Sequence, residues 1–255
     1  MASSEKELYG LIGYPLGHSF SQGYFNNKFT GEGINAEYLN FEIPSITDFT
    51  EIIASHPTLR GLNVTIPYKQ AVIPYLDDID PIARKIGAVN VIRVTRNNAG
   101  HVRLKGFNSD IIGFTDSISP LLAGKDHKKA LVLGTGGASH AVMAGLSKLG
   151  IEGTLVSRAP RPGVITYADL DEDIMASHTV IVNTTPLGMY PQVDACPDIP
   201  YGLVTEAHVC FDLLYNPDVT LFMQRCAEQG ATVKNGLEML LLQAFASWEM
   251  WHRTD

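Results

Sequence analysis

The stretch LVLGTGGASHAVMAGLSKLG, residues 131–150, joins an apolar run, a glycine-rich turn and a helical run in that order. This order predicts a β-strand, a tight turn and an α-helix. In a dinucleotide-binding turn, the first glycine allows the tight turn and the second lets the backbone approach a pyrophosphate at the helix N-terminus. Gly134, Gly136 and Gly137 fit this pattern, although Ser139 replaces the third glycine of GxGxxG. A plain strand–helix turn is the alternative, and the strand–turn–helix context favours cofactor binding.

The end of the next expected strand indicates which dinucleotide would bind. An NAD site has Asp or Glu about 20 residues after the glycines, where the carboxylate binds the ribose 2′-hydroxyl. Here the sequence is LVSRAPR (155–161), which places Ser157 and Arg158 at that position and Arg161 nearby. Because a guanidinium group binds phosphate in a bidentate way, we expect NADP(H). Ordinary solvated surface arginines are the alternative.

Strand-like and helix-like patterns alternate on both sides of this stretch. The alternation predicts an α/β fold with mainly parallel strands. Strands expected at 88–94 and 101–107 are joined by the turn-rich TRNNAG and form a hairpin. The charged segment KDHKK (125–129) is a candidate domain boundary. We expect two domains: an N-terminal α/β domain at 1–110 together with a C-terminal helix at 236–255, and a Rossmann-like dinucleotide-binding domain at 111–235.

Composition excludes several classes of protein. The 255 residues carry a formal net charge of −8, so no basic surface for nucleic acid is expected. Cys196, Cys210 and Cys226 are odd in number and lack metal-binding spacing, which predicts reduced thiols and no metal site. The N-terminus has no signal-peptide pattern, and no apolar run reaches the roughly 20 residues of a membrane span. We therefore expect a cytoplasmic protein that binds a small molecule.

A second stretch, NVTIPYK (63–69), places hydrogen-bonding side chains at the end of an apolar strand. Asn63 and Thr65 alternate, so in extended backbone they share one face. Pro67 is expected to end the strand, and Lys69 follows just beyond it. Taken alone, a single lysine is usually a solvated surface residue, so these residues by themselves leave the role of Lys69 open.

Several motifs in order resemble those of the shikimate dehydrogenase family, and the resemblance covers nearly the whole chain. NVTIPYK matches the central signature of the family fully, and GFNSD is similar to GxNTD with Ser109 in place of threonine. In GYPLGHSFSQ, Gln22 replaces the usual proline. The other similar segments are IGAVNV (86–91), GTGGASHA (134–141), NTTPLGM (183–189) and the two C-terminal stretches.

The resemblance implies a reversible reduction of 3-dehydroshikimate to shikimate with NADPH. Reduction of a ketone needs a hydride on carbon and a proton on the developing alkoxide. By resemblance, Lys69 supplies that proton and Asp110 is its partner, and a nearby carboxylate favours the charged lysine. His18 is then expected to have a structural or hinge role rather than a catalytic one.

The resemblance also assigns binding residues to both domains. Ser19 and Ser21 correspond to the pair that holds the substrate carboxylate, and in extended backbone their alternation would point both hydroxyls one way. The other substrate-binding candidates are Asn63, Thr65, Asn90, Tyr215 and Gln243. Tyr215 is as readily a core tyrosine, whereas Gln243 lies on an apolar helix, where a polar side chain needs a partner. The C-terminal helix is expected to return to the first domain.

The cofactor candidates centre on the glycine turn and the ends of the following strands. They are Gly134, Thr135, Gly136, Gly137, Ala138, Ser157, Arg158, Arg161, Asn183, Thr184 and Gly236. Leu187 and Met189 either pack against the nicotinamide or are structural. The assembly expected is a monomer or a homodimer.

Three alternatives remain open at this point. A quinate or broad-specificity dehydrogenase of the same family would accept a substrate with an added hydroxyl on the carboxylate-bearing carbon. A non-catalytic nucleotide-binding regulator would not need both Lys69 and Asp110. A folate-linked dehydrogenase of similar two-domain form would not predict the Ser19 and Ser21 motif.

Overall fold

The computed structural model describes residues 5–17 and 19–253. The chain folds into two compact units, with divisions between Ser109 and Asp110 and between Gln243 and Ala244. The first unit holds the chain up to Ser109 and the segment from Ala244 onward, and the second unit holds the residues between. His18, for which a structural or hinge role was expected, lies outside the described residues.

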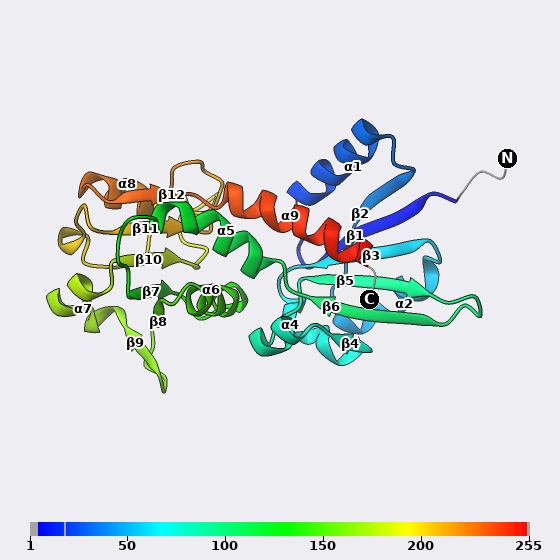
Figure 1. The fold of residues 1–255 in the computed structure, drawn as a ribbon, viewed down its shortest axis with the longest axis horizontal. Helices are drawn as coiled ribbons and strands as arrows, with labels where there is room; N and C mark the ends of the chain where they lie inside the picture. The colour runs from blue at the N-terminus through cyan, green and yellow to red at the C-terminus, as the bar shows by residue number, and fades with distance from the viewer. Residues whose placement is uncertain (1–4, 18, 254–255) are drawn as a thin grey trace. The chain divides into compact units, whose positions relative to one another are not determined.

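The first unit alternates strands with short helices (Figure 1). Its elements are β1 (Glu7–Gly13), α1 (Phe20–Glu32), β2 (Ala36–Glu42), η1 (Ile46–Asp48), α2 (Phe49–Ser55), β3 (Leu59–Val64), α3 (Tyr68–Ala71), η2 (Ile73–Tyr75), β4 (Asp78–Ile79), α4 (Pro81–Ile86), β5 (Val91–Arg96) and β6 (Val102–Phe107). Local sequence explains some boundaries. In α4, the Asp80 carboxylate accepts from the Ile82 N–H at 2.9 Å, Pro81 fits the first turn, and Gly87 ends the helix at φ +73°.

In this unit the described strands form one mixed sheet of six in the order β2-β1-β3-β5-β6-β4. β1 pairs with β2 and β3 in parallel, and β4 pairs with β6 in parallel. β5 is antiparallel to both β3 and β6, so the expected hairpin is confirmed. The carboxyl ends of β1, β2 and β3 consequently lie at one edge of the sheet, where an open α/β fold binds its ligands.

Hydrophobic side chains cover both faces of this sheet. α1 and the end of α9 (Leu237–His252) pack on one face, where Phe25, Tyr38 and Trp251 are buried together. Gly61 of β3 allows this packing, since a Cβ there would lie 2.5 Å from the Trp251 ring. Residues of α2, α3 and α4 cover the other face. The C-terminal helix therefore ends within the first unit, as expected from the sequence.

The second unit is a doubly wound α/β structure (Figure 1). Its elements are α5 (Asp110–Leu122), β7 (Lys129–Leu133), α6 (Gly137–Lys148), β8 (Glu152–Ser157), β9 (Val164–Thr166), η3 (Tyr167–Asp169), α7 (Glu172–Ser177), β10 (Val180–Asn183), η4 (Tyr201–Leu203), β11 (Val209–Asp212), α8 (Leu221–Glu228), β12 (Thr232–Lys234) and the first part of α9. The segment KDHKK lies between α5 and β7 inside this unit, so the boundary considered there is wrong.

All the described strands of the second unit pair in parallel, in the order β12-β11-β10-β7-β8-β9. α5 and α6 bury Phe114, Val142 and Leu146 on one face. α7 and α8 bury Met175 and Phe222 on the other. The order reverses at β7, next to β10, and this switch point is where a doubly wound sheet binds its dinucleotide.

Candidate functional site

The polar residues of NVTIPYK gather at the carboxyl end of the first sheet. Asn63 is the penultimate residue of β3, and Thr65 follows directly after the strand. The strand ends at Val64, three residues before the expected break at Pro67. Lys69 is half-buried in the short helix α3, and its backbone carbonyl accepts from the Val89 N–H at 2.8 Å. The fold thus holds Lys69 beside the segment that carries Asn90.

A network of hydrogen bonds fixes the amide side chains at this edge. Tyr38 Oη donates to Asn63 Oδ1 at 2.8 Å, and Asn63 Nδ2 donates to Ser247 Oγ at 2.9 Å. Ser247 Oγ lies 3.3 Å from Ser109 Oγ. Asn90 Oδ1 accepts from the Ser109 N–H at 2.7 Å. These bonds connect β2, β3, α9 and the residues that follow β6 into one largely buried polar network, which holds Asn63 and Asn90 in defined orientations.

The two serines of GYPLGHSFSQ are not on one strand face, contrary to expectation. α1 begins at Phe20, so Ser21 is helical, and Ser19 is the extended residue before the helix. Burial raises the pKa of Tyr38, and a hydrogen bond from Ser21 opposes the effect, which places the Ser21 hydroxyl at Tyr38. Ser19 Oγ is buried without a partner among the described residues. Of the pair, Ser19 is therefore the hydroxyl left available.

Lys69 and Asp110 fall on opposite sides of the division between the units. Asp110 is buried at the first position of α5, directly after Ser109 in the chain. Gln243 is the last residue of the second unit, and Tyr215 is 39% exposed in the loop after β11. The pairing of Lys69 with Asp110, and the approach of Tyr215 and Gln243 to the substrate, stay predictions.

The second unit contains a cavity of about 420 Å³ at the carboxyl ends of β7, β8 and β10. It brings together most of the residues predicted to bind a dinucleotide. These are Gly134, Thr135, Gly136, Ser157, Arg158, Arg161 and Thr184. Arg161 Nη1 donates to Thr135 Oγ1 at 3.4 Å, so this arginine lies over the glycine turn.

The glycine turn has the geometry that the sequence predicts. Gly134 has φ +106°, and a Cβ there would lie 2.9 Å from Thr184 Oγ1. Gly136 is the extended residue before α6, and Cβ atoms at Gly136 and Gly137 would meet nothing within 4 Å among the described atoms. Ser139 is fully buried, and its hydroxyl donates to the Gly136 carbonyl at 2.7 Å. The serine in place of the third glycine is therefore accommodated by a local hydrogen bond.

Four predicted cofactor residues do not line this cavity: Gly137, Ala138, Asn183 and Gly236. Asn183 is fully buried, where its Nδ2 donates to Asp212 at 3.1 Å and its Oδ1 accepts from the Thr185 hydroxyl at 2.7 Å. It thus orients Thr185, which does line the cavity. A Cβ on Gly236 would lie 2.1 Å from the Leu213 carbonyl oxygen, so glycine is required there by backbone packing.

Five more residues line the cavity: Ala159, Tyr167, Thr185, Pro186 and Leu187. Leu187 was considered from the sequence as a contact of the nicotinamide, and the other four were not identified. Thr185 and Pro186 closely follow β10, so their position at a strand end could have indicated them. Tyr167 follows the three-residue strand β9, which has no clear sequence signal. Burial raises the pKa of Tyr167, and the positive charge of Arg158 opposes the effect, which places Arg158 near this ring.

Behind the cavity, Asp212 has a strongly shifted pKa. Burial raises it to about 6, against hydrogen bonds from Thr220, the Leu214 N–H and Asn183. The folded state holds the proton of the Asp212 carboxyl more tightly than the unfolded chain does. Protonation of Asp212 therefore stabilises the folded state, fully below about pH 4, and this contribution is lost as the pH rises through about 6.

We expect Asp212→Asn to remove this pH dependence. The free energy of unfolding of the wild type, relative to the variant, should fall by on the order of 2–3 kcal/mol between pH 4 and pH 8. Urea unfolding at a series of pH values measures the difference. Parallel pH curves for the two proteins would contradict the shifted pKa.

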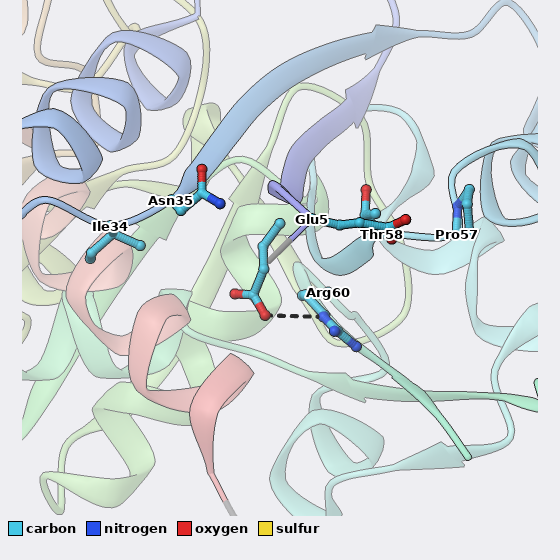
Figure 2. Close-up of a pocket in the computed structure, with 7 residues that line it drawn as sticks. Glu5, Ile34, Asn35, Pro57, Thr58 and Arg60 are labelled. Atoms are coloured by element: carbon cyan, nitrogen blue, oxygen red, sulfur yellow. Dashed lines mark hydrogen bonds and ion pairs between the residues drawn. The ribbon is translucent and has the colours of Figure 1, made fainter. Parts of the chain in front are cut away.

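A different cavity lies at the opposite edge of the first sheet (Figure 2). It is lined by residues at the amino ends of β1 and β3, among them Glu5, Glu7, Thr58 and Arg60. Arg60 Nε pairs with Glu7 Oε1 at 3.2 Å, and both side chains are at least 40% exposed. An exposed pair of this kind contributes little stability, and the amino ends of the strands are not where an open α/β sheet binds ligands.

The described part of the chain, residues 5–17 and 19–253, has no helix long and apolar enough to cross a membrane. Within the same ranges, no group of three or more His, Cys, Asp and Glu side chains is placed to bind a metal ion.

Comparisons with known proteins agree with this geometry. Residues 11–92 match the profile of the shikimate dehydrogenase substrate binding domain. The chain is 38% identical to the shikimate dehydrogenase (NADP(+)) of Halothermothrix orenii, over 98% of this chain and 92% of that protein. The crystal structure of shikimate dehydrogenase from Aquifex aeolicus is similar with a TM-score of 0.84, at 32% identity over 98% of this chain and 94% of that one. The structure of shikimate 5-dehydrogenase from Thermus thermophilus in complex with NADP(H) and shikimate has a TM-score of 0.82, at 28% identity over 96% and 93% of the two chains. From this full-length similarity, the chain belongs to the shikimate dehydrogenase family.

Proposed function

We propose that this protein is an NADP-dependent shikimate dehydrogenase, which reversibly reduces 3-dehydroshikimate to shikimate. The observation that carries the proposal is the 38% identity, over 98% of the chain, to a curated enzyme of that name. The arrangement of polar residues at the carboxyl end of the first sheet supports it, because a polyhydroxylated ring needs several oriented hydrogen-bonding groups.

The first unit would bind the substrate and move the proton. Asn63 and Asn90 would orient ring hydroxyls, since the network through Ser247 and Ser109 holds both amides. Ser19 would donate to the carboxylate. The Lys69 ammonium would protonate the oxygen of the ketone as it becomes an alkoxide, and in the reverse direction the lysine amine would take the hydroxyl proton.

The second unit would hold NADP(H), which supplies or accepts the hydride. Its donors fit that group, because open backbone at Gly136 and Gly137 begins the 12-residue helix α6, where a pyrophosphate is favoured. Arg158 directly follows β8 and Arg161 lies in the loop before β9, and no Asp or Glu lines the cavity among the residues that the structure describes. Two guanidinium groups there suit a 2′-phosphate.

The test is the initial rate of oxidation of shikimate and quinate, each with NADP⁺ and with NAD⁺, followed at the absorbance of reduced nicotinamide. We expect the fastest turnover with shikimate and NADP⁺. Bound cofactor with no turnover in any of the four assays would contradict the enzyme assignment and favour a nucleotide-binding regulator.

A further inference from the structure

Helix α1 and strand β2 run side by side in a register that brings Asn40 to the start of the helix. Asn26 Nδ2 donates to the Tyr38 carbonyl at 2.9 Å, and Asn26 Oδ1 accepts from the Tyr38 N–H at 2.9 Å. One turn earlier in the helix, Gln22 Oε1 accepts from Asn40 Nδ2 at 3.1 Å. Four helix residues and two strand residues each advance about 6–7 Å, so the two elements stay in step. By the same step, Ser19 lies just under one helical turn beyond Gln22, nearer the level of Phe41 and Glu42 than that of Asn40, toward the carboxyl end of β2.

The start of α1 has the sequence of a capping box but does not form one. In Ser-x-x-Gln, the serine would accept from a backbone N–H of the first turn, and the glutamine would reach back to the serine N–H. Here Ser19 makes no side-chain cap, and the Gln22 side chain bonds to Asn40 instead. Gln22 thus orients Asn40, and the Ser19 hydroxyl remains available.

Two polar atoms, one where α1 begins and one in the last part of β2, are buried without a partner in the described part of the chain: Ser19 Oγ and Asn40 Oδ1. A buried polar atom that stays unpaired destabilises the protein, so a ligand that pairs both would be favoured. The two atoms differ in chemistry. A serine hydroxyl can donate to a carboxylate, whereas an amide oxygen only accepts and so requires a donor such as a hydroxyl.

We infer that Asn40, held by Gln22, accepts a hydrogen bond from a hydroxyl on the carbon that bears the substrate's carboxylate. The inference rests on the proposed function, in which Ser19 holds that carboxylate. Shikimate has no hydroxyl on this carbon, and quinate has one. Asn40 is therefore a specificity-determining residue that extends the substrate class to saturated rings with a hydroxyl beside the carboxylate, and Gln22 is its positioning residue.

The test compares kcat/KM for quinate and shikimate with NADP⁺ in the wild type, Asn40→Leu and Gln22→Met. Asn40→Leu keeps the size of the side chain and removes the acceptor. It should lower kcat/KM for quinate about tenfold more than for shikimate, as expected for one lost hydrogen bond. Gln22→Met keeps Asn40 but removes the hydrogen bond that orients it. This variant should lower kcat/KM for quinate relative to shikimate by a smaller factor than Asn40→Leu does. Glu37→Gln, on β2 but away from Gln22, is the control and should leave both substrates unchanged.

Calorimetric titration of the holoprotein with each acid measures the same contact without turnover. Loss of affinity for quinate alone in Asn40→Leu would support the inference even if Asn40 has no effect on the chemical step. Wild-type protein that oxidises shikimate but neither binds nor oxidises quinate would overturn it, and so would equal losses for both acids in Asn40→Leu. Absence of shikimate oxidation in the wild type would instead contradict the proposed function. Circular dichroism of each variant checks that it is folded. If Asn40→Leu is misfolded, Gln22→Met, which is the milder change, still tests the inference.

Discussion

Replacing Lys69 with alanine is expected to lower kcat for shikimate oxidation by about 10²-fold or more, while shikimate still binds. The reason is that the hydroxyl proton must leave as the hydride leaves carbon, and alanine cannot accept it. Asn63, Asn90 and Ser19 would still hold the ring, so KM should change much less than kcat. Steady-state rates with NADP⁺, together with calorimetric titration of shikimate, measure both quantities.

The position of Lys69 supports a large effect on rate with a small effect on folding. The side chain is half-buried, and α3 is held in place through backbone hydrogen bonds, including the one from Val89 to the Lys69 carbonyl. Alanine keeps these bonds. Lys85→Ala, which removes an exposed lysine from α4 in the same unit, is the matched control and should have normal rates. Near-normal kcat in Lys69→Ala would remove this residue from the mechanism.

The layout of the second unit could be predicted because its signals are local in the sequence. A strand, a glycine turn and a helix follow one another within 20 residues, and the arginines come at the end of the next strand. The glycines of the turn and the spacing of hydrophobic residues are sufficient to predict these elements. The cavity formed by Gly134, Gly136, Ser157 and Arg158 follows from parallel strands whose carboxyl ends share one edge.

Errors arose where tertiary contacts decide the role of a residue. Ser21 was expected in extended backbone, but the helix starts one residue earlier and its hydroxyl bonds to Tyr38 on a neighbouring strand. Asn183 was expected at the cofactor, but its hydrogen bonds to Asp212 and Thr185 place it behind the cavity. Tyr38 and Asp212 cannot be identified as these partners from local sequence, since they are brought close to Ser21 and Asn183 only when the sheets form.

Short elements and unpaired atoms were also beyond prediction. β4, β9 and β12 have two or three residues each, too few for an alternating pattern, and so Tyr167 after β9 was not identified. The unpaired oxygen of Asn40 depends on the register between α1 and β2, which a single sequence does not specify.

Replacing Arg158 with alanine is expected to raise KM for NADP⁺ about tenfold or more, with KM for NAD⁺ within about twofold. A charge-assisted hydrogen bond to a phosphate contributes about 1.5–3 kcal/mol, and only NADP⁺ carries the 2′-phosphate. The guanidinium is exposed at the rim of the cavity, so screening by salt should place the effect toward the lower end of that range. Initial rates with shikimate, at varied concentrations of each cofactor, measure the preference.

The location of Arg158 makes this prediction specific to the phosphate. It follows Ser157, the last residue of β8, and its charge acts on Tyr167 across the same cavity. Arg225→Ala removes a guanidinium that lies 5.2 Å from the Tyr201 ring, elsewhere in the second unit, and should leave both KM values unchanged. Raising the ionic strength should weaken NADP⁺ binding in the wild type more than in Arg158→Ala, because the variant has lost one of the charges that salt screens. Equal losses for NADP⁺ and NAD⁺ in Arg158→Ala would show that the arginine supports the cavity as a whole and does not recognise the 2′-phosphate.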